Sequence, residues 1–342
     1  MIKIGVICPS EIAFRRFMPA LAKAEGFDFV GLGVCNATER FGDKLPSAEI
    51  VDAVLKQENE KAQSFVDVYG GKIYKSYREI ASSDEIDALY IPLPPALHFH
   101  WAKIALEHGK HVLIEKPSTI AFADTKALVG LAKKSSLALH ENYMFIFHDQ
   151  LKAINELVVS GEIGDVRLYN IKFGFPQRAA NDFRYNKALG GGALIDAGGY
   201  TIKYATKLLG KTARIACAQM NYTDEFDVDI YGSATMVNDA GVTVQLAFGM
   251  DNNYKCELEV WGSKGSLTTN RVLTAPAGFV SQMMIRKGNE DEFRDLPADD
   301  AFLKSILRFK ECIENETIRK ENYSLISKQA ELIDQFKKLA GS

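Results

Sequence analysis

The chain has 342 residues, of which 47% are hydrophobic and 25% are charged. It is longer than most single domains and too apolar to be disordered, so we expect two folded domains. The net charge of −3 offers no positive field for nucleic acid or for an anionic membrane surface. The sequence has no basic leader and no apolar stretch of ~18 residues, and its five cysteines form no CxxC pair. We therefore expect a cytoplasmic protein with reduced thiols.

In the first part of the chain, short apolar runs alternate with longer amphipathic stretches, which is typical of strands connected by crossover helices. This pattern predicts a doubly wound parallel sheet, a Rossmann-like domain, over residues 1–148. Its ligand crevice should lie beyond the carboxyl ends of the strands. The predicted strands are residues 2–8, 29–35, 88–91, 111–114 and 137–142, and the predicted helices are residues 12–24, 47–69, 98–108 and 122–135.

After a helix predicted at residues 150–160, apolar and polar residues alternate, as in antiparallel strands that are covered on one face. Val244, Leu246 and Phe248, for example, alternate with Gln245 and Ala247. The pattern predicts an α+β domain over residues 149–342 with a large, mostly antiparallel open sheet. It leaves open whether the C-terminal helix packs back on the first domain. Further helices are predicted at residues 190–209, 299–314 and 323–339.

The turn after the first strand is where the pyrophosphate of a dinucleotide would meet the free N–H groups of a helix start. The glycine pattern G-x-G-x-x-G/A expected there is mostly absent, and only Ala13 fits it. Taken alone, the segment is equally consistent with an ordinary βα turn. The residues at the six motif positions are Cys8, Pro9, Ser10, Glu11, Ile12 and Ala13.

The end of the second strand bears on the choice of dinucleotide. Asn36 stands where an acid would bind the ribose diol of NAD, and residues 31–38 contain no acid. A 2′-phosphate would therefore not be repelled, and Arg15, Arg16 and Arg40 are possible cations for it. The sequence favours NADP over NAD as the cofactor.

The fourth predicted strand ends in Glu115, Lys116 and Pro117, which places an ammonium at the mouth of the expected crevice. With the other motifs that occur in order along the chain, this segment resembles the Gfo/Idh/MocA oxidoreductases. Those motifs are Pro92-Leu93-Pro94 with Leu97, His98 and Trp101, then Glu141-Asn142, then residues 190–198 (GGGALIDAG), and then residues 261–266 (WGSKGS).

Many members of that family have the motif D-x-G-x-H after the triple glycine, whereas this chain has Tyr200 in place of the histidine. The variant is similar to a branch with glucose-fructose oxidoreductase, dimeric dihydrodiol dehydrogenases and nucleotide-sugar 3-ketoreductases. The last group fits best, because it shares an Asn-aromatic stretch like residues 142–145 and an Asp-x-Arg-Tyr like residues 182–185. The departures are the missing first-turn glycines and an extra helical stretch around residues 46–60.

The resemblance implies hydride transfer between a nicotinamide and a sugar or nucleotide-sugar carbonyl or carbinol. We expect Tyr200 to exchange the proton and Lys116 to orient it, since a nearby ammonium favours the phenolate; the reverse assignment is open. Asp196 is the third expected catalytic residue. The expected cofactor contacts are residues 8–13, Asn36, Arg40, Leu93, Pro94, His98, Glu115, Lys116 and Asn142, and the expected substrate contacts are Lys116, Asp182, Arg184, Tyr185, Asp196 and Tyr200.

Two other functions stay open: a pyranose or trans-dihydrodiol dehydrogenase, and a noncatalytic dinucleotide or metabolite sensor. The sensor is considered because Cys8 and Ser10 replace glycines that cradle phosphate. No metal site is expected, because the histidines lack HExxH spacing and cysteine partners. The resemblance also implies a homodimer or homotetramer, while the exact substrate and the direction of the reaction are not predicted.

Overall fold

Two β-sheets organise the computed structural model, which describes residues 1–341, and each sheet belongs to its own structural unit. Unit 1 consists of residues 1–119, 123–142 and 305–327. Unit 2 consists of residues 120–122, 143–304 and 328–341. Residues 305–327, which the sequence analysis placed in the second domain, thus belong to unit 1.

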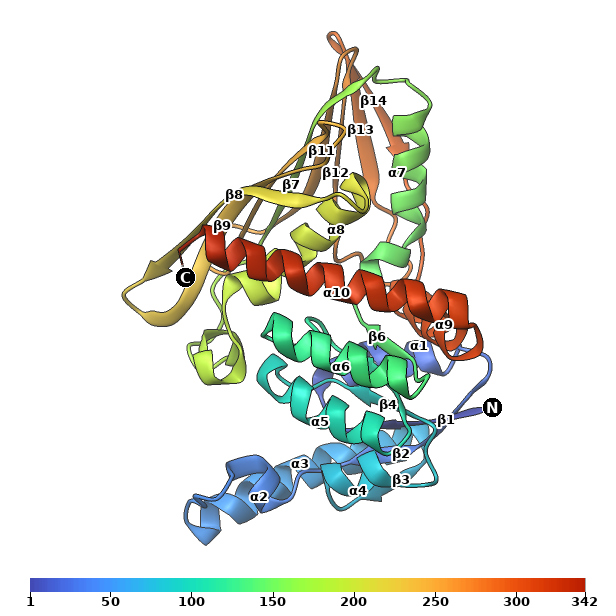
Figure 1. The fold of residues 1–342 in the computed structure, drawn as a ribbon, viewed down its shortest axis with the longest axis vertical. Coiled ribbons are helices and arrows are strands. Elements are labelled where there is room, and N and C mark those ends of the chain that lie inside the picture. Colours follow the sequence, from blue (N-terminus) through green and yellow to red (C-terminus); the bar gives the residue numbers. More distant parts are fainter. Residues whose placement is uncertain (342) are drawn as a thin grey trace. The chain divides into compact units, whose positions relative to one another are not determined.

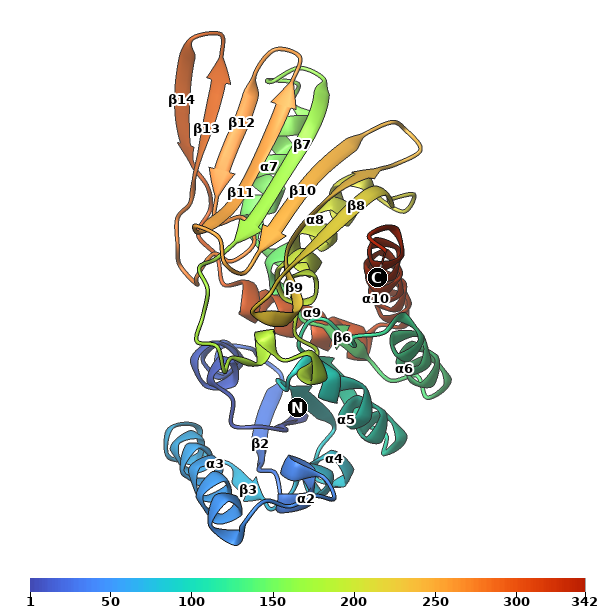
Figure 2. The same cartoon turned by 90° about the vertical axis from the view of Figure 1, so that its left-hand side faces the viewer.

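The sheet of unit 1 is parallel and has the strand order β3-β2-β1-β4-β5-β6 (Figures 1 and 2). The order reverses between β1 and β4, so the doubly wound sheet predicted from the sequence is confirmed. The three-residue strand β3 was missed because it is too short to show a period. The strands are β1 (Ile2–Val6), β2 (Phe27–Gly33), β3 (Lys72–Tyr74), β4 (Ala88–Ile91), β5 (His111–Ile114) and β6 (Leu139–Glu141).

Helices cover both faces of this sheet. Leu89 and Ile91 pack in one apolar cluster with residues of α4, α5 and α6, whereas Tyr90 points to the other face and stacks on Phe17 with 3.8 Å between ring centroids. The helix predicted at residues 12–24 consists of a π-helix, η1, followed by a short α1. The helices α2 and α4 were not predicted. The helices are η1 (Ala13–Phe17), α1 (Met18–Leu21), α2 (Ala37–Phe41), α3 (Ala48–Tyr69), α4 (Tyr77–Ser82), α5 (Pro95–Glu107), α6 (Phe122–Lys134), α9 (Ala301–Glu314) and α10 (Glu316–Leu339).

The sheet of unit 2 has eight strands in the order β14-β13-β12-β11-β7-β10-β9-β8. Neighbouring strands are antiparallel, except that β7 and β10 run parallel. The predicted open sheet is confirmed, since Val244, Leu246 and Phe248 are buried. The strands are β7 (Val166–Gly174), β8 (Arg214–Thr223), β9 (Phe226–Val237), β10 (Thr243–Gly249), β11 (Lys255–Gly262), β12 (Ser266–Asn270), β13 (Gln282–Lys287) and β14 (Glu290–Asp295).

Helices lie on one face of the second sheet, where Figure 2 shows α7 and α8 side by side. The later part of α10 packs there too, with the rings of Phe248 and Phe336 5.5 Å apart. The helix predicted from residue 190 begins only at Leu194, and α10 begins seven residues before its predicted start. No helix among residues 1–341 is long and apolar enough to cross a membrane. The helices are η2 (Met144–Phe147), α7 (Asp149–Val159), η3 (Phe183–Tyr185), η4 (Lys187–Leu189), η5 (Leu194–Gly198) and α8 (Gly199–Leu209).

Candidate functional site

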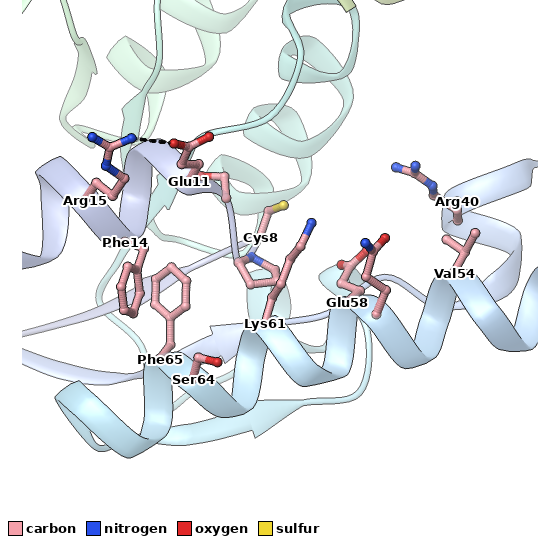
Figure 3. A pocket seen from close by; sticks show the side chains of 13 residues that line it. Cys8, Glu11, Phe14, Arg15, Arg40, Val54, Glu58, Lys61, Ser64 and Phe65 are labelled. Carbon is pink, nitrogen blue, oxygen red and sulfur yellow. Dashed lines mark hydrogen bonds and ion pairs between the residues drawn. The ribbon is translucent and has the colours of Figure 1, made fainter. Parts of the chain in front are cut away.

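A cavity of about 480 Å³ lies in unit 1 beside the turn that follows β1 (Figure 3). Four of the predicted motif residues, 8–11, line it, together with Arg40 from α2. Ile12 is partly exposed elsewhere and Ala13 is buried, so neither belongs to the wall. The predicted turn therefore does border a cavity of the size expected for a small-molecule site.

The turn is shaped by its own polar groups in place of glycines. The Ser10 N–H donates to the Cys8 carbonyl at 2.8 Å, and the Ser10 hydroxyl accepts the Ala13 N–H at 3.3 Å. Burial raises the pKa of the Cys8 thiol to about 12, so this side chain contributes a neutral wall. Arg15 is bound to Glu11 at 2.6 Å at the exposed rim, which reduces its role as a phosphate ligand.

The end of β2 differs from the sequence-based expectation in two respects. The Asn36 side chain accepts the Glu39 N–H at 2.9 Å and caps α2, and its expected cofactor contact stays a prediction. A carboxylate also reaches this strand end from α3, because Glu58 accepts the Cys35 N–H at 2.7 Å. Sequence reasoning missed Glu58 and its neighbour Lys61, which also lines the cavity. The extra helical stretch was the only signal for them.

Around Lys116, a buried histidine joins two turns. The ring nitrogens of His98 lie 2.8 Å from the Pro117 carbonyl and 2.7 Å from the Leu93 carbonyl, and the Lys116–Pro117 bond is cis. His98 is fully buried, and this burial lowers its pKa to about 4. The ring thereby positions the turns that carry Leu93, Pro94 and Lys116, and the expected cofactor contact by His98 stays a prediction.

Glu115 and Asn142 belong to one buried hydrogen-bond network in unit 1. The Tyr90 hydroxyl and the Asn142 amide each donate to the Glu115 carboxylate at 2.6 Å. The Ser305 hydroxyl donates to the Asn142 carbonyl oxygen at 2.8 Å. Burial raises the pKa of Glu115. Lys116, by contrast, is partly exposed between buried neighbours.

In unit 2 the glycine turn before η5 is held by a residue that the sequence analysis missed. The Asp229 carboxylate of β9 accepts the Leu194 N–H at 2.6 Å. Gly192 has a φ of +119°, and a Cβ there would collide with the Asp229 carboxylate. Burial raises the pKa of Asp229. The turn thereby sets where the helix that carries Asp196 and Tyr200 begins.

Tyr200 is held by other aromatic rings. Its ring centroid lies 5.3 to 5.6 Å from those of Phe173, Tyr143 and Phe145, and the residue is 9% exposed. Two of these rings come from the Asn-aromatic stretch that the sequence analysis singled out. Contacts of this kind hold the aromatic ring in place.

The predicted substrate residues 182–185 are engaged with other residues of unit 2. Arg184 donates to Asp196 at 2.7 Å and to Asp182 at 3.1 Å. Burial lowers the pKa of Arg184, but the two carboxylates outweigh this and raise it. Tyr185 stacks on Phe226 at 4.2 Å and donates to the Met250 carbonyl, so its hydroxyl supports the loop. Arg184 thus orients Asp196.

Lys116 belongs to unit 1, whereas Asp196 and Tyr200 belong to unit 2. The expectation that they converge therefore stays a prediction. Within residues 1–341, no group of three or more His, Cys, Asp or Glu side chains is arranged to hold a metal ion.

Comparison with known proteins identifies the family. Residues 27–143 match the oxidoreductase family model with an NAD-binding Rossmann fold, and residues 151–268 match the GFO/IDH/MocA C-terminal domain. The chain belongs to the Gfo/Idh/MocA oxidoreductases. Similar Gfo/Idh/MocA proteins include a dTDP-3,4-didehydro-2,6-dideoxy-alpha-D-glucose 3-reductase of Streptomyces violaceoruber, which is 35% identical over 99% of this chain and 95% of that protein.

Two further comparisons concern the branch of the Gfo/Idh/MocA family. The solved structure of a 3-ketoreductase from Actinomadura kijaniata, in complex with NADP and TDP-benzene, superposes with a TM-score of 0.88 at 32% identity. The match covers 98% of this chain and 97% of that one. A trans-1,2-dihydrobenzene-1,2-diol dehydrogenase of Xenopus laevis is 31% identical over 52% of this chain and 54% of that protein. These comparisons confirm the family and the branch that the sequence motifs indicated.

Proposed function

We propose that this protein is an NADP-dependent reductase of nucleotide-sugar ketones. The observation that carries the proposal is the rigidly caged Tyr200 at the end of the glycine turn, in a chain that also presents a partly exposed Lys116. The Actinomadura 3-ketoreductase has been solved with NADP and TDP-benzene as variants with one lysine or one tyrosine replaced. That lysine and tyrosine are separated by the same number of residues as Lys116 and Tyr200.

The residues around the first-turn cavity fit the adenosine end of NADP. Arg40 and Lys61 line it and bring positive charge for a 2′-phosphate. The turn after β1 lies at the switch point of the sheet, where dinucleotides bind in this architecture. When bound, the reduced nicotinamide supplies the hydride.

The roles of the chain's own residues follow from their chemistry. As the substrate carbonyl carbon gains hydride, its oxygen gains negative charge and requires a proton, which Tyr200 donates. Lys116 stabilises that charge and orients the phenol. Asp196 is held by Arg184, so it offers a fixed acceptor for a substrate hydroxyl. We propose that Tyr200 and Lys116 act together on the same substrate carbonyl.

Replacing Lys116 with Met, or Tyr200 with Phe, tests this mechanism. Each variant should lower kcat at least about a hundredfold, because a positioned proton donor contributes that much or more. NADPH affinity, measured by fluorescence titration, should change much less. The exposed Lys103→Met serves as the control on α5. Unchanged turnover in both site variants would remove the proposed mechanism.

A second function is favoured by the Xenopus relative, which is a trans-1,2-dihydrobenzene-1,2-diol dehydrogenase. Rates with NADP⁺ and a free pyranose or trans-dihydrodiol should then exceed the rates of ketone reduction on nucleotide-linked sugars. A noncatalytic sensor predicts dinucleotide binding without turnover of any of these substrates. One set of assays with the wild-type protein separates the three functions.

We further propose that the protein is a homodimer or homotetramer. The face of the second sheet that points away from α8 carries Trp261, 60% exposed, and Phe293, 59% exposed. Large exposed aromatic side chains on an open sheet favour a protein interface. The mass in solution, measured by sedimentation equilibrium, tests this.

A further inference from the structure

The cavity beside the first turn is lined by the carboxylate of Glu58, which comes from α3 and not from the strand β2. Glu58 stands on α3, 23 residues after Cys35, and lines the cavity close to the end of β2 (Figure 3). In sheets of this class, the acid that binds the adenosine ribose normally follows the second strand directly. In this chain a neighbouring helix delivers it.

Three donors fix the position of the Glu58 carboxylate. The Cys35 N–H and the Tyr77 hydroxyl donate to Oε1 at 2.7 and 2.9 Å, and the Cys35 thiol donates to Oε2 at 2.7 Å. These donors come from the end of β2 and from α4, so the carboxylate is tied to the strand end from two sides. A carboxylate with this many donors keeps its place.

Two cations share the cavity with Glu58. Lys61 lies one turn further along α3, and Arg40 projects from α2 (Figure 3). Neither forms an ion pair with another residue in the part of the chain that the structure describes. A 2′-phosphate bound here would be attracted by the two cations and repelled by the carboxylate, whereas a free ribose diol would donate to the carboxylate.

We propose that Glu58 sets the preference between NADP(H) and NAD(H) from α3, by opposing the attraction of Arg40 and Lys61 for a 2′-phosphate. The inference rests on the proposed function, because it concerns the same dinucleotide site. It gives the helix α3, which carries Glu58 and Lys61, a part in cofactor specificity beside Arg40 of α2. On α3, the negative charge of Glu58 opposes binding of a 2′-phosphate and the positive charge of Lys61 favours it.

The test is the ratio of the Kd for NADH to the Kd for NADPH, measured by fluorescence titration of the full-length protein. Glu58→Gln should raise this ratio about tenfold, the effect of one unit charge about 5 Å away in a hydrated cavity. Lys61→Met and Arg40→Met should each lower it by about the same factor. Glu60→Gln, an exposed acid on α3 outside the cavity, is the matched control and should leave the ratio unchanged.

The ratio cancels any general loss of affinity, and Gln at position 58 retains an oxygen that accepts the Cys35 N–H. The Kd ratio of Lys61→Met gives a second test, because Lys61 is exposed and its replacement leaves the buried hydrogen bonds of Glu58 intact. Binding of both dinucleotides with an unchanged or lowered ratio in Glu58→Gln overturns this inference and leaves the proposed function standing. Absence of binding of either dinucleotide to the wild-type protein overturns both.

Discussion

At the scale of single residues, the Asp229 carboxylate holds the glycine turn before η5 in place. It stands on β9, yet it accepts the first N–H of η5 and occupies the space that a side chain at position 192 would need. The triple glycine of the sequence is therefore only half of the motif, and its partner lies 37 residues further along the chain. Because Asp229 is so far from the triple glycine in the sequence, the glycine motif was recognised but Asp229 was not.

We predict that Asp229→Ala lowers the free energy of unfolding by about 1–3 kcal/mol, because the buried Leu194 N–H loses its acceptor. Asp229→Asn keeps an acceptor oxygen and removes the charge whose burial raises the Asp229 pKa, so it should lie much closer to the wild type. Urea unfolding measures both. The exposed Asp227→Ala is the control on the same strand. If Asp229→Ala proved as stable as that control, the role of Asp229 in the turn would be wrong.

Arg184 shows the limit of assigning roles from residue type alone. The sequence analysis expected it to contact substrate. In the structure it binds Asp182 and Asp196 and stacks over Phe183, with its guanidinium carbon 4.6 Å from the ring centroid. These contacts orient Asp196, and the expected substrate contact of Arg184 stays a prediction.

At the scale of elements, the five-residue helix α2 depends on its neighbour. A helix of this length does not form on its own in water. The Glu39 carboxylate accepts the Asn36 N–H, completing a capping box, and also accepts the N–H groups of Tyr77 and Arg78 in the first turn of α4. One side chain thus serves the N-termini of two helices, and it holds α2, which carries Arg40, against α4.

We predict that Glu39→Ala destabilises the protein by about 1–2 kcal/mol, since the caps of two helices are lost together. Glu49→Ala, an acid in the first turn of α3 that makes no cap bond, should change stability by less than about 0.5 kcal/mol. Thermal or urea unfolding of both variants gives the comparison. Equal stabilities for the two variants would contradict the shared cap.

For the molecule as a whole, buried histidines couple stability to pH. Burial is the main reason that the pKa values of His98 and His111 are lowered from 6.5 to about 4. Between these values, the unfolded chain binds protons that the folded chain does not. The free energy of unfolding is therefore highest above pH 6.5 and falls as the pH drops towards 4, by up to the order of 3 kcal/mol for each histidine.

We predict that His98→Gln flattens this pH dependence, because it removes one of the protons taken up on unfolding. Other groups titrate in the same range, so the measured quantity is the difference in slope between variant and wild type, from urea unfolding between pH 4 and 7. His100→Gln, an exposed histidine on the same helix, is the control. A slope for His98→Gln equal to that of the control would show that His98 is not buried as a neutral ring.

The sequence by itself determined the two sheets, their strand types, the family, and the positions of Lys116, Asp196 and Tyr200 in its motifs. These features produce hydrophobic periods and motifs of consecutive residues, which can be recognised without knowing how the chain packs. It did not show α2, α4 or β3, which are too short to display a period and are stabilised by contacts with their neighbours.

Only the tertiary structure decided which polar groups meet. Glu58 reaches the end of β2, Asp229 reaches the glycine turn, and Ser305 reaches Asn142, although 23 to 163 residues separate these partners in the chain. The physical reason is that a buried hydrogen-bonding group must find a partner, but any nearby donor or acceptor satisfies it. Packing, and not sequence spacing, selects which one that is.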